Sequence, residues 1–209
     1  MVRVKICGIT NAADALAAID AGADLLGFNF YEKSPRHIDR AEAAKIRRQL
    51  PKKIEAVGIF VNAPPADVAK VCQSLKLNAA QLHGDESPET VAEVASSLTV
   101  WKAFRVDPDF HLKTLDEYAQ ASAFLFDAAH TGQYGGTGRT TDWDIARRAA
   151  VGHRIILAGG LNLENVAAAV RIVRPHAVDV ASGVESKPGK KDHGRMREFI
   201  QEVRRGERK

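Results

Sequence analysis

The chain has 209 residues, of which 45% are hydrophobic and 27% charged, so it can bury a substantial core and has the composition of an ordinary globular protein. Its net charge of +4 arises in the last segment, from Lys187 to Lys209, while the rest of the chain is nearly neutral. This distribution argues against a nucleic-acid partner, which usually requires a broad basic face. We expect a solvated basic helix that frays over residues 205–209.

The two cysteines, Cys7 and Cys72, lie far apart, and no cysteine–histidine cluster has the spacing of zinc ligands. We therefore expect neither a disulfide framework nor a bound metal. No apolar run is long enough for a signal peptide or a membrane span. These features predict a reduced, cytoplasmic protein without a membrane partner.

Eight short apolar runs alternate with helical patterns along the whole chain. Each run is almost continuously apolar, as expected for parallel strands that are covered by helices. The predicted strands are Val4–Cys7, Leu25–Phe30, Ala56–Val61, Ala79–His83, Val100–Phe104, Ala123–Asp127, Ile155–Ala158 and Val178–Ala181.

The segments between the runs have the periodicity of amphipathic helices. Apolar residues recur at helical spacing from Val68 to Leu75, from Val91 to Leu98 and from Met196 to Val203. Cys72 belongs to the first of these stripes, so we assign it to packing. Ser87 and the pair Pro64–Pro65 provide helix start signals.

Strands interleaved with helices from end to end predict an α/β protein with a single-domain (β/α)8 TIM barrel over residues 1–209. An open doubly wound sheet is the alternative architecture. The two longest connections follow the predicted strands that end at Phe30 and Asp127, on the face where barrels bind ligands. The "GGTG" stretch, Gly135–Gly138, lies in the second connection and predicts a mobile lid rather than a dinucleotide site.

Glycine-containing turns follow the last two predicted strands, in the stretches "LAGGLN" and "VASGVES". Such turns let the backbone N–H groups approach an anion closely, and barrels often bind phosphate at this position. We therefore predict a phosphate site that includes Gly160, Ser182 and Gly183. The alternative is that these glycines only permit tight turns.

Several other polar residues stand where predicted strands end or in the first long loop. Asp127 closes an apolar strand, where partial burial would favour its protonated form and allow proton donation; it could instead cap a turn. Cys7 is either an inert thiol or, if its pKa is lowered, a base. His83 could be a hydrogen-bonded wall residue, and Arg36 either a carboxylate clamp or an exposed loop side chain.

Seven stretches in chain order resemble the phosphoribosylanthranilate isomerase family: "KICGIT", "GADLLGFNFYEKSPR", "VGIFVN", "AAQLHGDE", "GGTGRTTDW", "LAGGLNLENV" and "VDVASGVESKPGKKD". The match is loosest in the helices and between Asp107 and Ala123. Ala181 stands where the family usually has serine, a departure that removes no catalytic group. The resemblance implies a barrel of tryptophan biosynthesis that performs an Amadori rearrangement of N-(5-phosphoribosyl)anthranilate and needs no cofactor.

The resemblance also implies roles for individual residues. Asp127 would be the general acid that protonates the furanose oxygen, and Cys7 the base that removes the C2 proton. Arg36 would hold the anthranilate carboxylate. The remaining substrate-binding residues would be His83, Gly160, Ser182 and Gly183. The implied partner is a phosphorylated aminosugar, and the family includes monomers and homodimers.

Two other functions remain open at this point. One is a related phosphate-binding isomerase of histidine biosynthesis, or a dual-substrate enzyme; those relatives have an aspartate where Cys7 stands and are built from paired half-barrels, whereas this chain shows no half-length repeat. The other is a barrel that binds a phosphorylated ligand without catalysis. The presence of Cys7, Asp127 and Arg36 together argues against it.

Overall fold

The computed structural model describes residues 1–128 and 142–208, and the predicted lid at Gly135–Gly138 lies outside them. The strands are β1 (Arg3–Cys7), β2 (Leu25–Asn29), β3 (Glu55–Phe60), β4 (Ala79–Leu82), β5 (Val100–Val106), β6 (Ala123–Ala128), β7 (Ile155–Leu157), β8 (Ala177–Val180), β9 (Glu185–Lys187) and β10 (Lys190–Lys191). The helices are α1 (Ala12–Ala21), α2 (Arg40–Gln49), α3 (Pro65–Leu75), α4 (Pro88–Ala95), α5 (Thr114–Glu117), α6 (Trp143–Ala149), α7 (Val166–Val173), η1 (Ser182–Val184) and α8 (His193–Glu207).

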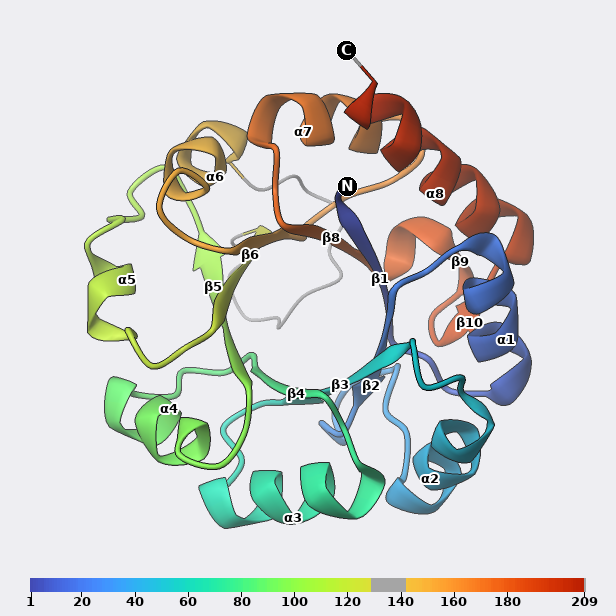
Figure 1. Cartoon of the computed structure of the whole chain (residues 1–209), viewed down its shortest axis with the longest axis horizontal. Helices are drawn as coiled ribbons and strands as arrows, with labels where there is room; N and C mark the ends of the chain where they lie inside the picture. Colours follow the sequence, from blue (N-terminus) through green and yellow to red (C-terminus); the bar gives the residue numbers. More distant parts are fainter. Residues whose placement is uncertain (129–141, 209) are drawn as a thin grey trace.

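Strands β1 to β8 form a closed parallel barrel, and the α-helices surround it (Figure 1). The decisive pairing is between β8 and β1, where Lys5 lies opposite Asp179. An open sheet would leave both of these strands at edges. The predicted (β/α)8 barrel is therefore confirmed over the doubly wound alternative.

The observed strands match the eight predicted runs to within two residues at each end. The hairpin formed by β9 and β10 was not predicted, because its polar sequence carries no strand periodicity. Helix α8 extends to Glu207, and so includes most of the segment predicted to fray. The last turn is held because Gly206 packs closely on Ala167 and the Glu207 carboxylate accepts a hydrogen bond from the Val2 N–H.

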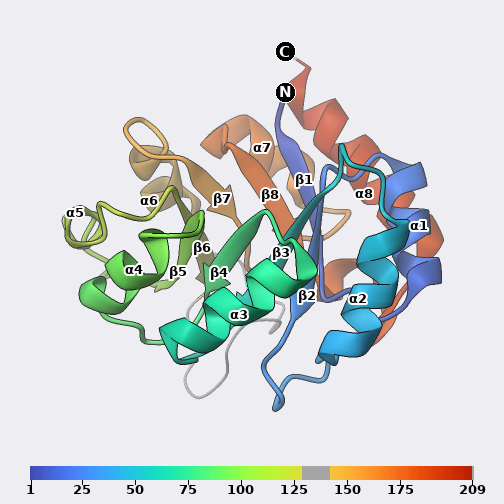
Figure 2. The same ribbon diagram turned by 60° about the horizontal axis from the view of Figure 1, so that its bottom comes forward.

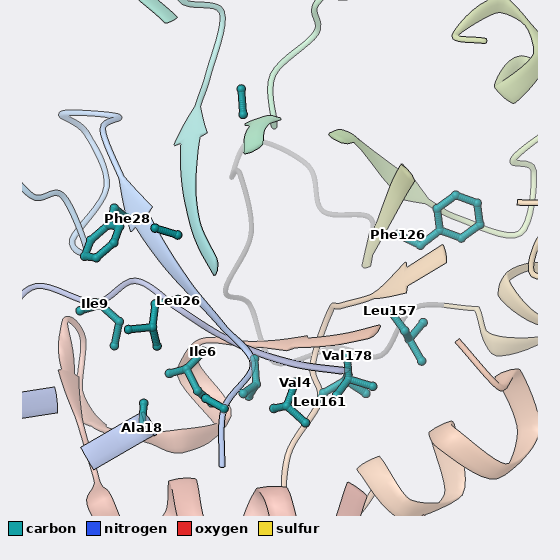
Figure 3. Packing of buried hydrophobic residues seen from close by; sticks show 14 of the residues in the cluster. Val4, Ile6, Ile9, Ala18, Leu26, Phe28, Phe126, Leu157, Leu161 and Val178 are labelled. Carbon is teal, nitrogen blue, oxygen red and sulfur yellow. The ribbon is translucent and has the colours of Figure 1, made fainter. Parts of the chain in front are cut away.

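The apolar core has two layers that follow from the alternation of side chains along a strand. One layer fills the space between barrel and helices, and Figure 3 shows part of it, including Val4, Ile6, Phe28 and Phe126. The other layer fills the barrel interior and consists of Leu25, Val57, Ala79, Trp101, Ala103, Ala123, Leu125, Ile156, Ala158 and Ala177.

Both chain ends lie at the end of the barrel where β1 begins (Figure 2). Because the barrel strands are parallel, their carboxyl ends meet at the opposite mouth. Buried polar residues occur toward that mouth, among them Gln81, Asp127 and Asp179. Within the described residues, every helix is too short or too polar to span a lipid bilayer.

Phe126 offers a test of the outer core layer, because its ring is fully buried between β6 and the surrounding helices. We expect Phe126→Ala to lower the free energy of unfolding by about 3 to 5 kcal/mol, the usual cost of removing a buried aromatic ring. Val151→Ala is the control, since Val151 is 90% exposed and its loss should change stability by less than about 0.5 kcal/mol. Chemical denaturation measures both, and similar losses in the two variants would contradict this core assignment.

Candidate active site

The barrel mouth brings together residues that are dispersed along the sequence. Cys7 is the last residue of β1, His83 follows β4, and Asp127 lies near the end of β6. Gly160 follows β7, and Ser182 begins η1 after β8. Most of the predicted site residues therefore stand at strand ends on one face, as the carboxyl ends of parallel strands require.

Asp127 and His83 lie side by side at this mouth. The His83 Nε2 atom is 3.3 Å from Asp127 Oδ2, and both side chains are largely buried. On the other side of the imidazole, Gln81 Nε2 lies 2.8 Å from Nδ1. Nε2 has no hydrogen-bond partner among the described residues, so the contact with Asp127 is a close approach of the two side chains. The second Asp127 oxygen, Oδ1, accepts the backbone N–H of Ala128 at 2.8 Å.

Two glycines, Gly8 and Gly27, leave the space that Cys7 and its neighbour Arg36 occupy. Opposite Cys7 in register lies Gly27, where an added Cβ would come within 3.1 Å of the Cys7 sulfur. Gly8 follows with φ +75°, and a Cβ there would lie 2.6 Å from Arg36 Cδ. A side chain at either glycine would therefore displace Cys7 or Arg36.

The groups around Cys7 shift the pKa of its thiol in opposite directions. Burial raises the pKa of the thiol, and the Asp179 carboxylate raises it further, while Lys5 and Lys191 act in the other direction. The net pKa is above the ordinary value for cysteine. The lowered pKa that would make Cys7 a ready base is thus not present in this structure, because desolvation outweighs the two cations.

Arg36 is held in place rather than exposed in a loop. Its Nε donates to Glu185 Oε1 at 2.9 Å and its Nη2 to Oε2 at 2.7 Å, and the side chain is only 13% exposed. Lys191 Nζ donates to the same carboxylate at 2.9 Å. Among the described residues no acceptor bonds Nη1, so the guanidinium still has donors for a carboxylate ligand.

The two glycine turns lie directly against each other. Gly159 and Gly160 have positive φ angles, and a Cβ at Gly183 would lie 2.1 Å from the Leu161 carbonyl oxygen. The turns line one hollow together with Asp127 and Asp179. Gly160 and Gly183 thus bring two stretches of backbone close enough to share one small anion.

Several residues at this mouth were not predicted from the sequence: Lys5, Gln81, Asp179, Glu185 and Lys191. A signal existed for the first three, because Lys5, Gln81 and Asp179 each stand two residues before the end of a predicted strand, on the same face as the residue at that end. For Glu185 and Lys191 the sequence carries no such signal. In the described part of the chain, no group of three or more His, Cys, Asp or Glu residues is arranged to hold a metal ion.

Known proteins match this chain over almost its full length. A family model described as N-(5'phosphoribosyl)anthranilate (PRA) isomerase matches residues 4–202. The N-(5'-phosphoribosyl)anthranilate isomerase of Trichlorobacter lovleyi is 51% identical over 98% of both chains.

Solved structures agree with this match. Phosphoribosyl anthranilate isomerase from Thermotoga maritima has a TM-score of 0.91 and 42% identity, and it covers 98% of this chain and 99% of its own. A phosphoribosyl anthranilate isomerase in complex with reduced 1-(o-carboxyphenylamino)-1-deoxyribulose 5-phosphate has a TM-score of 0.87 and 41% identity, over 98% and 99% of the two chains. This chain belongs to the phosphoribosylanthranilate isomerase family.

Proposed function

We propose that this chain catalyses the Amadori rearrangement of N-(5'-phosphoribosyl)anthranilate to 1-(2-carboxyphenylamino)-1-deoxyribulose 5-phosphate, a step of tryptophan biosynthesis. One observation carries the assignment of roles: Asp179 lines the same hollow as Asp127 and also acts on the Cys7 thiol. Asp127 lines that hollow and Cys7 closes β1, the strand paired with the β8 strand of Asp179, so both stand at the same barrel mouth although they are far apart in the sequence. A sugar bound at that mouth can be approached by a carboxyl group and by a thiol.

The chemistry needs one acid and one base. Asp127 transfers its proton to the furanose ring oxygen, the C1–O bond breaks, and the anthranilate nitrogen supplies the electron pair that forms the iminium. The Cys7 thiolate then takes the C2 proton, and the C–H electron pair neutralises the iminium to give the enolamine. Protonation at C1, together with loss of the proton from the C2 hydroxyl group, then yields the ketone. His83, whose Nε2 lies 3.3 Å from Asp127 Oδ2, stands beside the carboxylate that the first step leaves behind.

The two ends of the substrate are anchored on opposite sides of the reacting carbons. Backbone N–H groups of the turns at Gly160, Ser182 and Gly183 bind the phosphate, and Arg36 binds the anthranilate carboxylate with the donors that Glu185 leaves unused. Because both ends of the substrate are fixed, its reacting carbons are held close to the acid and the base. Because the substrate nitrogen is itself the electron source and sink, the proposal requires no cofactor.

The proposal applies equally to a monomer and to a homodimer, because all of the site residues named above come from one chain. A structure of mutually generated monomers of dimeric phosphoribosylanthranilate isomerase from Thermotoga maritima is 41% identical to this chain, with a TM-score of 0.85. The proposed base must stay a free thiol, which is how Cys7 occurs here. A cytoplasmic location would keep it reduced.

The acid and base roles predict that Cys7→Ser and Asp127→Asn each lower kcat by at least about 100-fold, the usual contribution of a general acid or base. Loss of the fluorescence of the anthranilate adduct measures turnover, and circular dichroism checks the fold. Cys72→Ala is the control. Cys72 is buried on α3, outside the barrel interior, so this substitution should leave kcat unchanged. Assaying the aminoaldose phosphate of histidine biosynthesis in parallel tests the alternative substrate. A folded variant with nearly full kcat would rule out that residue's role.

The dependence of kcat/KM on pH tests whether the buried Cys7 thiol must ionise for the reaction. Because burial raises the pKa of Cys7, the thiolate is a minor form at neutral pH and increases as the pH rises. We therefore expect kcat/KM of the wild-type enzyme to rise with pH from neutral into the alkaline range. Steady-state kinetics across that range provide the measurement. A profile that is already flat at neutral pH would mean that the thiolate is not what limits the reaction.

The joined turns predict a specific sensitivity at Gly183. In Gly183→Ala the added methyl group would meet the Leu161 carbonyl oxygen at 2.1 Å and push the two turns apart. We expect KM to rise by about tenfold or more, and the affinity for inorganic phosphate as an inhibitor to fall in parallel, because phosphate binding is lost. Gly152→Ala is the matched control, since nothing lies within 4 Å of a Cβ there. Unchanged KM in Gly183→Ala would remove the phosphate site from this position.

A further inference from the structure

Lys5 is a charged side chain inside the barrel that the proposed reaction scheme does not use. Its side chain is 0% exposed, and its Nζ lies 3.0 Å from Asp179 Oδ1. The two residues stand opposite each other on β1 and β8. Burying such a pair carries a desolvation cost, and an apolar pair of similar volume often serves stability as well or better. The position of this cation therefore calls for an explanation other than packing.

The geometry of β1 places Lys5 beside the proposed base. Lys5 and Cys7 are two residues apart on one strand, so both side chains point into the barrel. Lys5 donates to Asp179, and it lowers the pKa of the Cys7 thiol, which burial raises. The Lys5 ammonium thus contacts the Asp179 carboxylate and stands two residues before the Cys7 thiol on the same face of β1.

Lys5 carries a positive charge at neutral pH. Burial alone lowers the pKa of a lysine, but Asp179 and Cys7 raise the pKa of Lys5 above its ordinary value. The ammonium is therefore protonated at neutral pH. Other groups face Cys7 as well: Asp179 from β8, Lys191 from β10 and Arg36 from the loop after β2. Lys191 and Arg36 share the Glu185 carboxylate, which offsets much of their charge.

We propose that Lys5 is a positioning residue for the base: its ammonium, held by Asp179, stabilises the thiolate form of Cys7 inside the barrel. The inference rests on the proposed function for the role of Cys7. Asp179 then has two opposing effects, because it fixes Lys5 in place and also disfavours a second negative charge nearby. Lys5 makes the thiolate attainable in a site where burial works against it.

The two halves of this ion pair provide the test. Thiolate reactivity is measured without substrate, as the rate at which iodoacetamide alkylates Cys7, with peptide mass spectrometry to separate Cys7 from Cys72. We expect Lys5→Met to slow alkylation of Cys7 at neutral pH by about tenfold, the effect of losing one close opposite charge. Asp179→Asn should accelerate it. In turnover assays, Lys5→Met should move the rising part of the kcat/KM profile to higher pH.

A purely structural ion pair makes a different prediction, since breaking it from either side would loosen the barrel in the same way. Alkylation that changes in the same direction in both variants would therefore overturn the proposal. Lys102→Met is the matched control: Lys102 is equally buried and paired with Glu86 at 2.9 Å, but it does not act on Cys7. It should lose stability and leave Cys7 alkylation unchanged.

Folding of the variants does not decide the outcome. If Lys5→Met fails to fold, Lys5→Gln carries the same test with a neutral polar side chain, and alkylation of Cys7 at the wild-type rate in the folded variant would refute the inference. Alkylation of Cys72 shows in every sample whether the protein is folded. Burial raises the pKa of Cys72 to about 12, and the thiol becomes accessible when the protein unfolds. Because alkylation needs no turnover, a failure here is distinguishable from a failure of the proposed reaction.

Discussion

Closure of the barrel is the constraint on which the rest of this structure depends. Hydrogen bonding between β8 and β1 brings the two ends of the chain together and places Asp179 opposite Lys5. Since all eight strands of the barrel are parallel, closure also sends every carboxyl end to one mouth. Cys7, His83 and Asp127 meet there because of this geometry, and not because of any local preference in their own segments.

The mouth is built from buried charges, whereas the barrel floor is apolar. Two groups of opposite charge are held there with little exposure: Lys5 with Asp179, and Glu185 with both Arg36 and Lys191. Each group has a partner at 3.0 Å or less, so the cost of removing the charges from water is offset by direct pairing. The result is a polar site whose charges have fixed positions, as preorganised electrostatic catalysis requires.

The short hairpin after β8 links this site to the outside of the barrel. Gly189 donates its N–H to Glu185 at 3.3 Å, and its carbonyl accepts the Thr10 hydroxyl at 2.6 Å. The Lys191 N–H donates to Asp14 of α1. The hairpin thus ties the carboxylate that holds Arg36 to the segment that follows Cys7. The proposed carboxylate clamp and the proposed base are parts of one connected unit.

The sequence by itself determined the alternation of strands and helices, because parallel strands covered by helices must be continuously apolar and the helices must be amphipathic. It also determined where glycine turns and polar strand ends fall, so Cys7, Asp127 and the two turns could be recognised as candidates. These features are local, and each is encoded within about ten neighbouring residues by the periods of strand and helix.

Only the tertiary structure decided which side chains are partners. Arg36 is clamped by Glu185, 149 residues away in the sequence, and this pairing excludes the exposed loop arginine that the sequence left open. The contact between His83 and Asp127, and the place of Lys5 beside Cys7 and Asp179, likewise depend on strands that closure brings together. The balance that raises the pKa of Cys7 is also decided there, since burial and the distances between charges are properties of the closed barrel that no periodicity records.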